Sequence, residues 1–165
     1  MIDLEALHER HPCLLPEHTA ALALFAATAL QRANHAPGVE VQVDVLGTVG
    51  VEPFTWAPRP VDATLATLDA NHITEFGAEA LALSLVHESR GWVVRRRLQR
   101  FESADWLLED GAGELVALEV SGTVDGDAAD RMRDKLVQVA KADAVRCVAC
   151  VVRFLEPAAW LGQAR

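Results

Sequence analysis

The sequence lacks any apolar run long enough to cross a membrane, has no low-complexity tract and contains only three cysteines. A membrane-spanning helix needs roughly 20 apolar residues, and a secretion signal begins with a basic stretch, whereas this chain begins with acids and histidines. We therefore expect a cytoplasmic protein without membrane contact. The odd set Cys13, Cys147 and Cys150 favours reduced thiols over a disulfide framework. A length of 165 residues, 51% of them hydrophobic, predicts one ordered globular domain.

An overall excess of basic charge is also missing. The formal net charge of −9 excludes a protein that coats nucleic acid nonspecifically, because such affinity comes largely from clustered Lys and Arg. Local charge differs from the total, since five arginines fall within eleven positions: Arg90, Arg95, Arg96, Arg97 and Arg100. A charged face that guards an edge strand is one interpretation of this segment. The other is phosphate binding, with Arg95, Arg97 and Arg100 as nucleic-acid contacts.

The first 70 residues predict a helical and strand extension packed on the rest of the domain. Residues 16–34 are rich in Ala and Leu, as in a buried helix, and valines alternate with polar residues over 39–45, as in a half-buried strand. Gly and Pro over residues 47–60 predict a loop, and a short helix is expected near 61–68. Phe54 and Trp56 in that loop are candidate contacts for a target or for a homodimer partner.

Residues 71–165 predict an α/β unit. A helix is expected from Thr74, a plausible N-cap, through about residue 89. Three strands then follow at 92–101, 104–108 and 114–121. A helix over 127–141 and a buried strand over 145–154 complete the order helix, three strands, helix, strand.

Glu119 is the residue in this unit that most needs an explanation. Residues two apart on a strand share a face, so Glu119 lies on an otherwise apolar face with Leu115 and Ala117. A carboxylate there is costly unless it is paired, exposed at the strand end or bound to a cation. Asp105 opens the preceding strand and is its expected neighbour. Two converging carboxylates suit Mg²⁺ or Mn²⁺, which could activate water for phosphodiester cleavage.

A third carboxylate for this site is expected from the helix that begins near Thr74. Glu79 is the first candidate, provided that its face of the helix turns toward the strand ends. Glu75, one turn earlier on the same side, is the alternative.

The pattern resembles the PD-(D/E)XK superfamily, the restriction-endonuclease-like fold, whose core runs αβββαβ around a mixed central sheet. Three segments within about residues 74–155 carry the resemblance: GAEALALSLVHESRGWVV with Glu79, SADWLL with Asp105, and LVALEVSG with Glu119. The resemblance implies a divalent-metal-dependent endonuclease acting on DNA, with these three acids as metal ligands. It also implies that residues 71–165 form the nuclease-like core.

The chain departs from the family motif at two positions. Ser121 stands where the family has Lys two residues after the acid, and Ala104 replaces the proline before Asp105. Related nucleases supply the missing Lys from the following helix, so the resemblance gives Lys135 the catalytic role, with Gln138 as a polar neighbour that contacts nucleic acid. If Lys135 does not reach the carboxylates, a degenerate nuclease fold that serves as a binding or assembly subunit is the alternative. A generic α/β binding domain is the third possibility.

Two other groups of residues invite metal binding. His8, His11, Cys13 and His18 have a spacing compatible with zinc, but no second matching pair follows, so ordinary histidines are favoured. Cys147 and Cys150 lie three apart on a predicted strand, point to opposite faces and are expected to be buried thiols.

Overall fold

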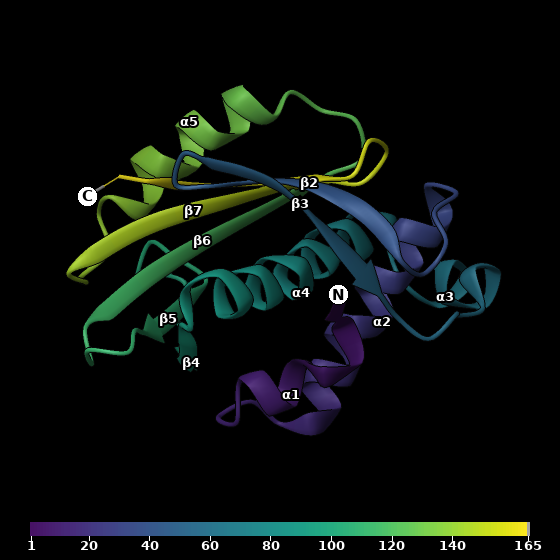
Figure 1. The fold of residues 1–165 in the computed structure, drawn as a ribbon, viewed down its shortest axis with the longest axis horizontal. Coiled ribbons are helices and arrows are strands. Elements are labelled where there is room, and N and C mark those ends of the chain that lie inside the picture. The colour runs from purple at the N-terminus through teal and green to yellow at the C-terminus, as the bar shows by residue number, and fades with distance from the viewer. Residues whose placement is uncertain (165) are drawn as a thin grey trace.

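The computed structural model describes residues 1–164 as a mixed α/β fold built on one eight-stranded sheet (Figure 1). The strands are β1 Ile2–Asp3, β2 Val39–Val45, β3 Thr48–Thr55, β4 Val93–Arg97, β5 Trp106–Glu109, β6 Leu115–Thr123, β7 Arg146–Arg153 and β8 Ala158–Gln163. The α-helices are α1 Leu7–Arg10, α2 Pro16–Arg32, α3 Val61–Thr67, α4 Ala70–Arg90 and α5 Ala128–Val139, and a 3₁₀ turn covers Leu4–Ala6. Within residues 1–164, no helix combines the length and apolarity that crossing a membrane requires.

The strand order across the sheet is β1-β3-β2-β8-β7-β6-β5-β4. Strands β4, β5 and β6 form an antiparallel meander, and β7 returns parallel to β6 after the crossover through α5. The predicted order of helix, three strands, helix and strand is thus confirmed from α4 to β7, with ends that differ by a few residues. Strand β8, which was not predicted, pairs antiparallel with β7 and parallel with β2. Through β8, the strands of the first 70 residues join the same sheet.

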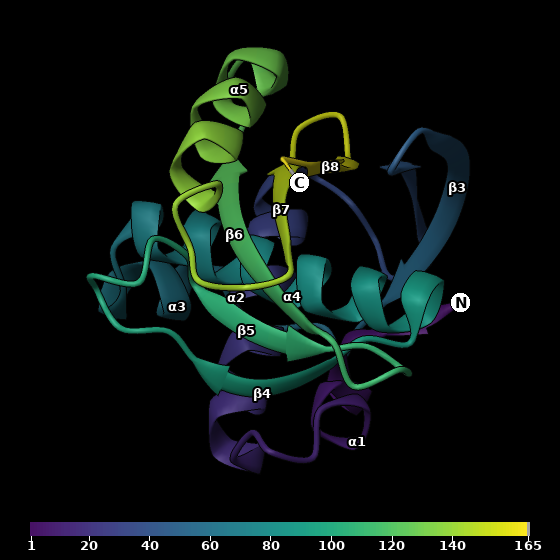
Figure 2. The same ribbon diagram turned by 90° about the vertical axis from the view of Figure 1, so that its left-hand side faces the viewer.

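The helices cover the two faces of the sheet unequally. Helices α2 and α4 lie on one face and bury the larger hydrophobic cluster, whereas α5 lies alone on the other face, over β6 and β7 (Figures 1 and 2). The sheet is strongly curled, so that the β2–β3 hairpin bends away from α5 (Figure 2). Every residue of β6 from Val116 to Thr123 is buried, because helices cover both of its faces.

The predicted loop after β2 was wrong, because residues 48–55 form β3. Leu46 and Gly47 both have positive φ, 54° and 87°, the conformation of the primed turns that suit two-residue hairpins. Pro53 is tolerated because β1 pairs only with the end of β3, so the outer side of Pro53 needs no ladder donor. Phe54 and Trp56 are 0% and 4% exposed, which contradicts their prediction as contact residues. Both rings belong to the core under α2 and α4 instead.

Helix α4 begins four residues earlier than predicted. Asp69 is the N-cap, and its side chain accepts hydrogen bonds from the amides of Asn71 and His72. Thr74, the predicted cap, lies inside the helix and donates its hydroxyl to the Ala70 carbonyl at 3.0 Å. The helix ends at Gly91, whose φ of 68° is the left-handed conformation that glycine adopts readily.

Gly122 allows α4 to lie directly on β6. A Cβ atom at this position would stand 2.3 Å from the Thr74 carbonyl oxygen and 3.0 Å from the Ala78 side chain. The oxygen belongs to helix backbone, so it cannot rotate away as a flexible side chain could. This close approach fixes the level at which Glu79, one residue after Ala78, meets the sheet.

We therefore expect Gly122→Ala to destabilise the fold by about 2 kcal/mol or more, the size of a strong overpacking effect. The matched control is Gly111→Ala in the β5–β6 turn, where a Cβ meets no atom within 4 Å and φ is not positive. The free energy of unfolding from urea titrations checks both variants. Equal stabilities for the two would contradict the close packing of α4 on β6.

Candidate functional site

Glu119 lies on the face of β6 that α5 covers, and its side chain is only 4% exposed. Its Oε1 atom accepts hydrogen bonds from Lys135 Nζ at 2.5 Å and from Gln138 Nε2 at 2.8 Å. Both donors come from α5, where residues three apart share a face. The structure thus brings Lys135 and Gln138 to Glu119, as the resemblance implied.

Asp105 extends the pairing of β5 with β6 by one further residue. Its amide donates to the Leu118 carbonyl at 3.0 Å, and its Oδ2 atom accepts from the Val120 amide at 2.8 Å. Just before β5 begins, the Asp105 side chain therefore accepts the hydrogen bond that a strand carbonyl would otherwise accept. Because Val120 follows Glu119 directly, these bonds hold the Asp105 carboxylate beside that of Glu119.

The charge of Asp105 affects the ionisation of Glu119. The pKa of Glu119 is raised from an ordinary 4.5 to about 7, first by burial and then by the negative charge of Asp105. The ammonium group of Lys135 acts in the opposite direction and only partly offsets the increase. Near neutral pH, Glu119 therefore exchanges between the protonated form and an ionised form that pairs with Lys135.

Glu79 is buried on α4, but it is held by groups other than the two site carboxylates. Arg97 donates to its two oxygens at 2.6 and 3.0 Å, and the Trp106 indole donates to Oε2 at 3.1 Å. Burial raises the pKa of Glu79, and the hydrogen bonds from Arg97 counter this rise. Glu75, the alternative to Glu79, is exposed. Glu79 is thus neutralised by an ion pair and lies outside the Glu119 hydrogen-bond network.

Arg97 connects these two groups of residues. Its guanidinium lies 4.7 Å from the centre of the Trp106 ring, a cation–π geometry. Its pKa is raised, first by the hydrogen bonds to Glu79 and also by the charges of Asp105 and Glu119. Arg97 was predicted only as a nucleic-acid contact, and its pairing with Glu79 was not predicted. No short-range sequence spacing joins residues from α4 and β4 in this way.

A hollow of about 280 Å³ opens over the two carboxylates. The connection between β4 and β5 forms one wall, and the lining residues are Arg97, Leu98, Gln99, Arg100, Ser103, Ala104, Asp105, Glu119 and Gln138. Arg100 makes no hydrogen bond or ion pair with any residue in the described range. It is the cation of this wall whose charge is not already matched by an acid.

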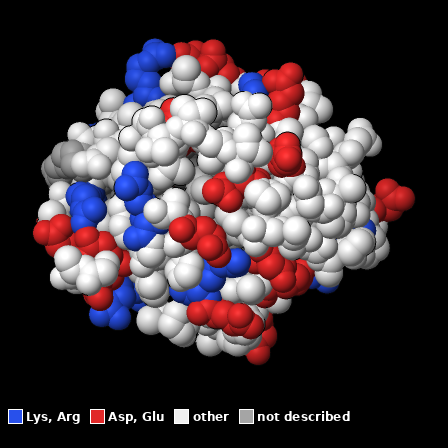
Figure 3. Space-filling model, in the orientation of Figure 1, with Lys and Arg blue, Asp and Glu red and all other residues white. Residues whose placement is uncertain are grey.

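The other arginines of the predicted basic strip are paired. Arg95 bonds Glu109 at 2.7 Å, and Arg96 bonds both oxygens of Glu102 at 2.6 and 2.9 Å. On the face shown in Figure 3, basic side chains likewise lie next to acidic ones instead of forming a continuous strip. Of the three predicted phosphate contacts, Arg95 is neutralised on the edge strand, whereas Arg97 and Arg100 line the hollow.

The predicted three-carboxylate metal site does not assemble as a compact cluster. Among residues 1–164, no group of three or more His, Cys, Asp or Glu side chains is arranged to hold a metal ion. Asp105 and Glu119 remain as an adjacent pair. Ser121, at the position of the family lysine, accepts a hydrogen bond from Arg131 at 3.3 Å.

The N-terminal histidines do not form the alternative zinc site. His11 is fully buried, and its Nε2 atom donates to the Leu83 carbonyl while its Nδ1 atom accepts from the Val94 amide. Burial lowers the pKa of His11 to about 4, so it is neutral at pH 7 with both ring nitrogens engaged. Cys147 and Cys150 are buried in separate clusters on opposite sheet faces, as predicted.

Comparisons of this chain with protein-family models, with curated proteins and with solved structures find no match. The geometry around Glu119 and the order of the strands are therefore the observations from which a function is inferred.

We expect Glu119→Gln to gain stability relative to the wild type as pH rises. A carboxyl whose pKa is raised on folding stabilises the fold while it is protonated, so the wild type loses this contribution between pH 4.5 and about 7. The amide does not titrate, so the difference in unfolding free energy should shift by up to about 3 kcal/mol between pH 4 and pH 8.

The control for this titration is Asp134→Asn, which removes an exposed acid from the same helix α5. Urea unfolding at several pH values measures both variants against the wild type. A Glu119→Gln difference as independent of pH as that of the control would contradict the raised pKa.

Proposed function

We propose that this chain is a divalent-metal-dependent nuclease that hydrolyses phosphodiester bonds in DNA. In this proposal Asp105 and Glu119 hold Mg²⁺ or Mn²⁺, and Lys135 acts on the scissile phosphate or on the attacking water. The observation that carries it is the convergence of Lys135 and Gln138 on Glu119, beside Asp105. Two donors on a buried carboxylate would satisfy a structural ion pair as well, whereas the neighbouring charge of Asp105 adds repulsion that such a pair does not need.

The strand order supports a restriction-endonuclease-like core from α4 to β7. An antiparallel meander of three strands, a crossover helix and a parallel fourth strand follow one another in the order αβββαβ. Asp105 stands at the start of the second of these strands, and Glu119 lies within the third. The first 70 residues and β8 are then an elaboration that widens the sheet.

The two carboxylates fit the requirements of a hard divalent cation. Mg²⁺ is commonly bound by one or two carboxylates, with water and substrate phosphate completing the shell. The pKa of Glu119 is raised partly by the charge of Asp105, a repulsion that a cation between the two groups would relieve. Such a cation, when bound, would lower the pKa of a water ligand and stabilise charge on the phosphate.

The protein side chains have distinct roles in this reaction. Hydrolysis adds one water to phosphorus and breaks one P–O ester bond, leaving a phosphate monoester and a hydroxyl group. Lys135 supplies positive charge for the phosphorane-like transition state, because its ammonium group lies at Glu119 and its side chain is 27% exposed. Arg100, unpaired on the wall of the hollow, is suited to a neighbouring phosphate.

The ion pairs of the two buried acids favour a second, noncatalytic function. Glu79 is already paired with Arg97, and Glu119 is already paired with Lys135. A degenerate nuclease fold that binds a partner without cutting would retain such pairs, because they satisfy buried charges without any metal. The two functions differ in whether metal displaces Lys135 from Glu119.

Cleavage of supercoiled plasmid and of single-stranded DNA with Mg²⁺ or Mn²⁺ tests the proposal. We expect metal-dependent cleavage by the wild type and a loss of at least ~100-fold in Glu119→Gln and in Lys135→Met, the size typical of a lost electrostatic or acid–base group. The matched controls are Asp134→Asn and Lys141→Met, which remove the same kinds of charge from exposed positions near the same helix.

Cleavage that persists in Glu119→Gln and Lys135→Met would contradict the assignment of the site. An inactive wild type that also shows no calorimetric binding of Mn²⁺ would favour the noncatalytic function. Thermal unfolding of every variant separates a lost site from a lost fold.

A further inference from the structure

Helix α5 leaves part of its sheet face uncovered. It lies over β6 and β7 and reaches β8 at Gly162, where an added Cβ would stand 3.0 Å from Met132 Sδ and 3.5 Å from Leu136. Trp160 pairs in register with Val151 of β7 and with Asp44 of β2, so these residues point to the α5 side. The sheet continues beyond α5 through β2 to β3, and no helix among residues 1–164 covers this part (Figure 2).

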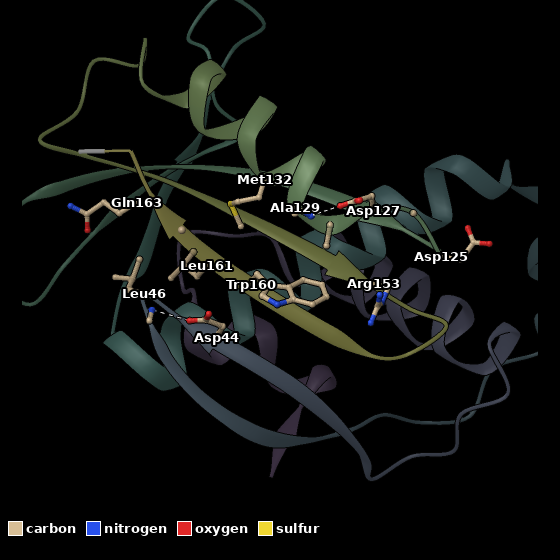
Figure 4. A pocket seen from close by; sticks show the side chains of 14 residues that line it. Asp44, Leu46, Asp125, Asp127, Ala129, Met132, Arg153, Trp160, Leu161 and Gln163 are labelled. Atoms are coloured by element: carbon tan, nitrogen blue, oxygen red, sulfur yellow. Dashed lines mark hydrogen bonds between the residues drawn. The ribbon is translucent and has the colours of Figure 1, made fainter.

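The uncovered face forms a groove beside α5. A cavity of about 990 Å³ lies between the N-terminal half of α5, β8 and the β2–β3 turn, at the upper end of the size range of ligand pockets. Figure 4 shows the Trp160 ring above β8 with Met132 reaching toward it from α5, and Leu46 and Leu161 beside them. Trp160, Met132 and Leu46 offer apolar side-chain surface to an occupant, whereas the Leu161 side chain is 2% exposed and belongs to the core on the other face of the sheet.

Two further exposed apolar side chains lie on the hairpin beyond the groove. Val49 pairs in register with Asp44, and Val51 pairs with Gln42, so both valines lie on this same face of β3. They are 78% and 51% exposed. Because Asp44 also pairs with Trp160 of β8, its polar side chain lies between Val49 and the groove, so the valines do not extend the apolar surface of the groove.

Acidic groups surround the groove. Asp44, Asp125 and Asp127 line it, against one cation, Arg153. Arg153 is paired with Glu156 at 2.9 Å and stacks on Trp160 with its guanidinium 5.4 Å from the ring centre. Asp125 makes no hydrogen bond or ion pair within the described residues, and its carboxylate points into solvent (Figure 4). This charge repels phosphate and attracts cations.

We infer that this groove binds an amphipathic, positively charged helix of a partner protein. The apolar side of that helix would pack on Trp160, Met132 and Leu46, and its Lys or Arg side chains would face the three aspartates. Helix α5 already packs on the adjacent part of this face, so a second helix would complete the layer. The acidic rim excludes DNA as the occupant.

A second copy of this chain is a poor occupant. The protein carries a net charge of −9, and most arginines of its basic segment are already paired with its own acids. The inference does not depend on the proposed nuclease activity, because no residue that lines the groove also lines the hollow over Asp105 and Glu119.

Binding of a model helix tests the inference. The probe is a four-turn peptide of about 14 residues with Leu on one face and Lys on the other, and its counterpart carries Glu in place of Lys. We expect calorimetry at physiological salt to detect the Lys peptide and not the Glu peptide. Asp125→Lys and Met132→Lys should each weaken binding at least ~10-fold, whereas Glu119→Gln should leave it unchanged.

The matched control is Asp62→Lys, the same charge reversal at an exposed acid in α3. A loss as large in Asp62→Lys as in Asp125→Lys would mean general charge attraction and would overturn the inference. Equal binding of the Glu peptide, or a dimer in sedimentation experiments that Met132→Lys dissolves, would overturn it as well. Asp125 is exposed in a connection, so its variant keeps the test valid if Met132→Lys does not fold.

Discussion

The buried carboxylate of Glu119 is the constraint on which the contacts between α5 and β6 depend. A charge within a strand covered on both faces would cost several kcal/mol without compensation. Compensation comes from α5, where Lys135 and Gln138 both donate to the Glu119 carboxylate. These contacts determine which face of α5 meets β6. The smaller core cluster, which includes Ala117, Val139 and Ala149, packs around the same contact.

The hydrogen bond and charge of Lys135 do not fully offset the effects of burial and of Asp105, because the pKa of Glu119 remains raised. Asp105 fills the place of a missing strand carbonyl, but its charge also raises the pKa of Glu119. An asparagine could accept the same hydrogen bond from the Val120 amide, so this hydrogen bond does not by itself require an acid at position 105. Glu79 shows the contrasting case, in which an arginine fork and an indole satisfy a buried acid.

Much of the fold could be predicted from the sequence, because its signals are local. Alternating valines identified β2, Ala-rich periodicity identified α2, and the order from α4 to β7 followed from short segments separated by turn residues. The errors had physical causes as well. Gly47 lies in a turn, as predicted, but Pro53 was interpreted as a loop residue although it lies in β3, at a position that β1 does not pair with. The pairing of β8 with β2 joins residues more than 100 positions apart, and no local pattern encodes it.

The candidate site was predictable in part for the same reason. Strand periodicity placed Glu119 on an apolar face, and the family resemblance connected it with Asp105 and Lys135. The pairing of Arg97 with Glu79 depends on the position of α4 relative to β4. Gly122 contributes to this position, because it lets α4 pack closely on β6. The acidic groove at Trp160 was also beyond the sequence, because β2 and α5 meet there only in the folded chain.

The central claim is that Asp105 and Glu119 form one site for a divalent cation. Titration of the Glu119 side-chain carboxyl by ¹³C NMR, with and without saturating Mg²⁺, tests it most directly. Without metal we predict a midpoint near pH 7, and with Mg²⁺ a midpoint lower by at least about one unit, because the cation binds the ionised form. A midpoint near 4.5, or one near 7 that Mg²⁺ does not move, would contradict the claim.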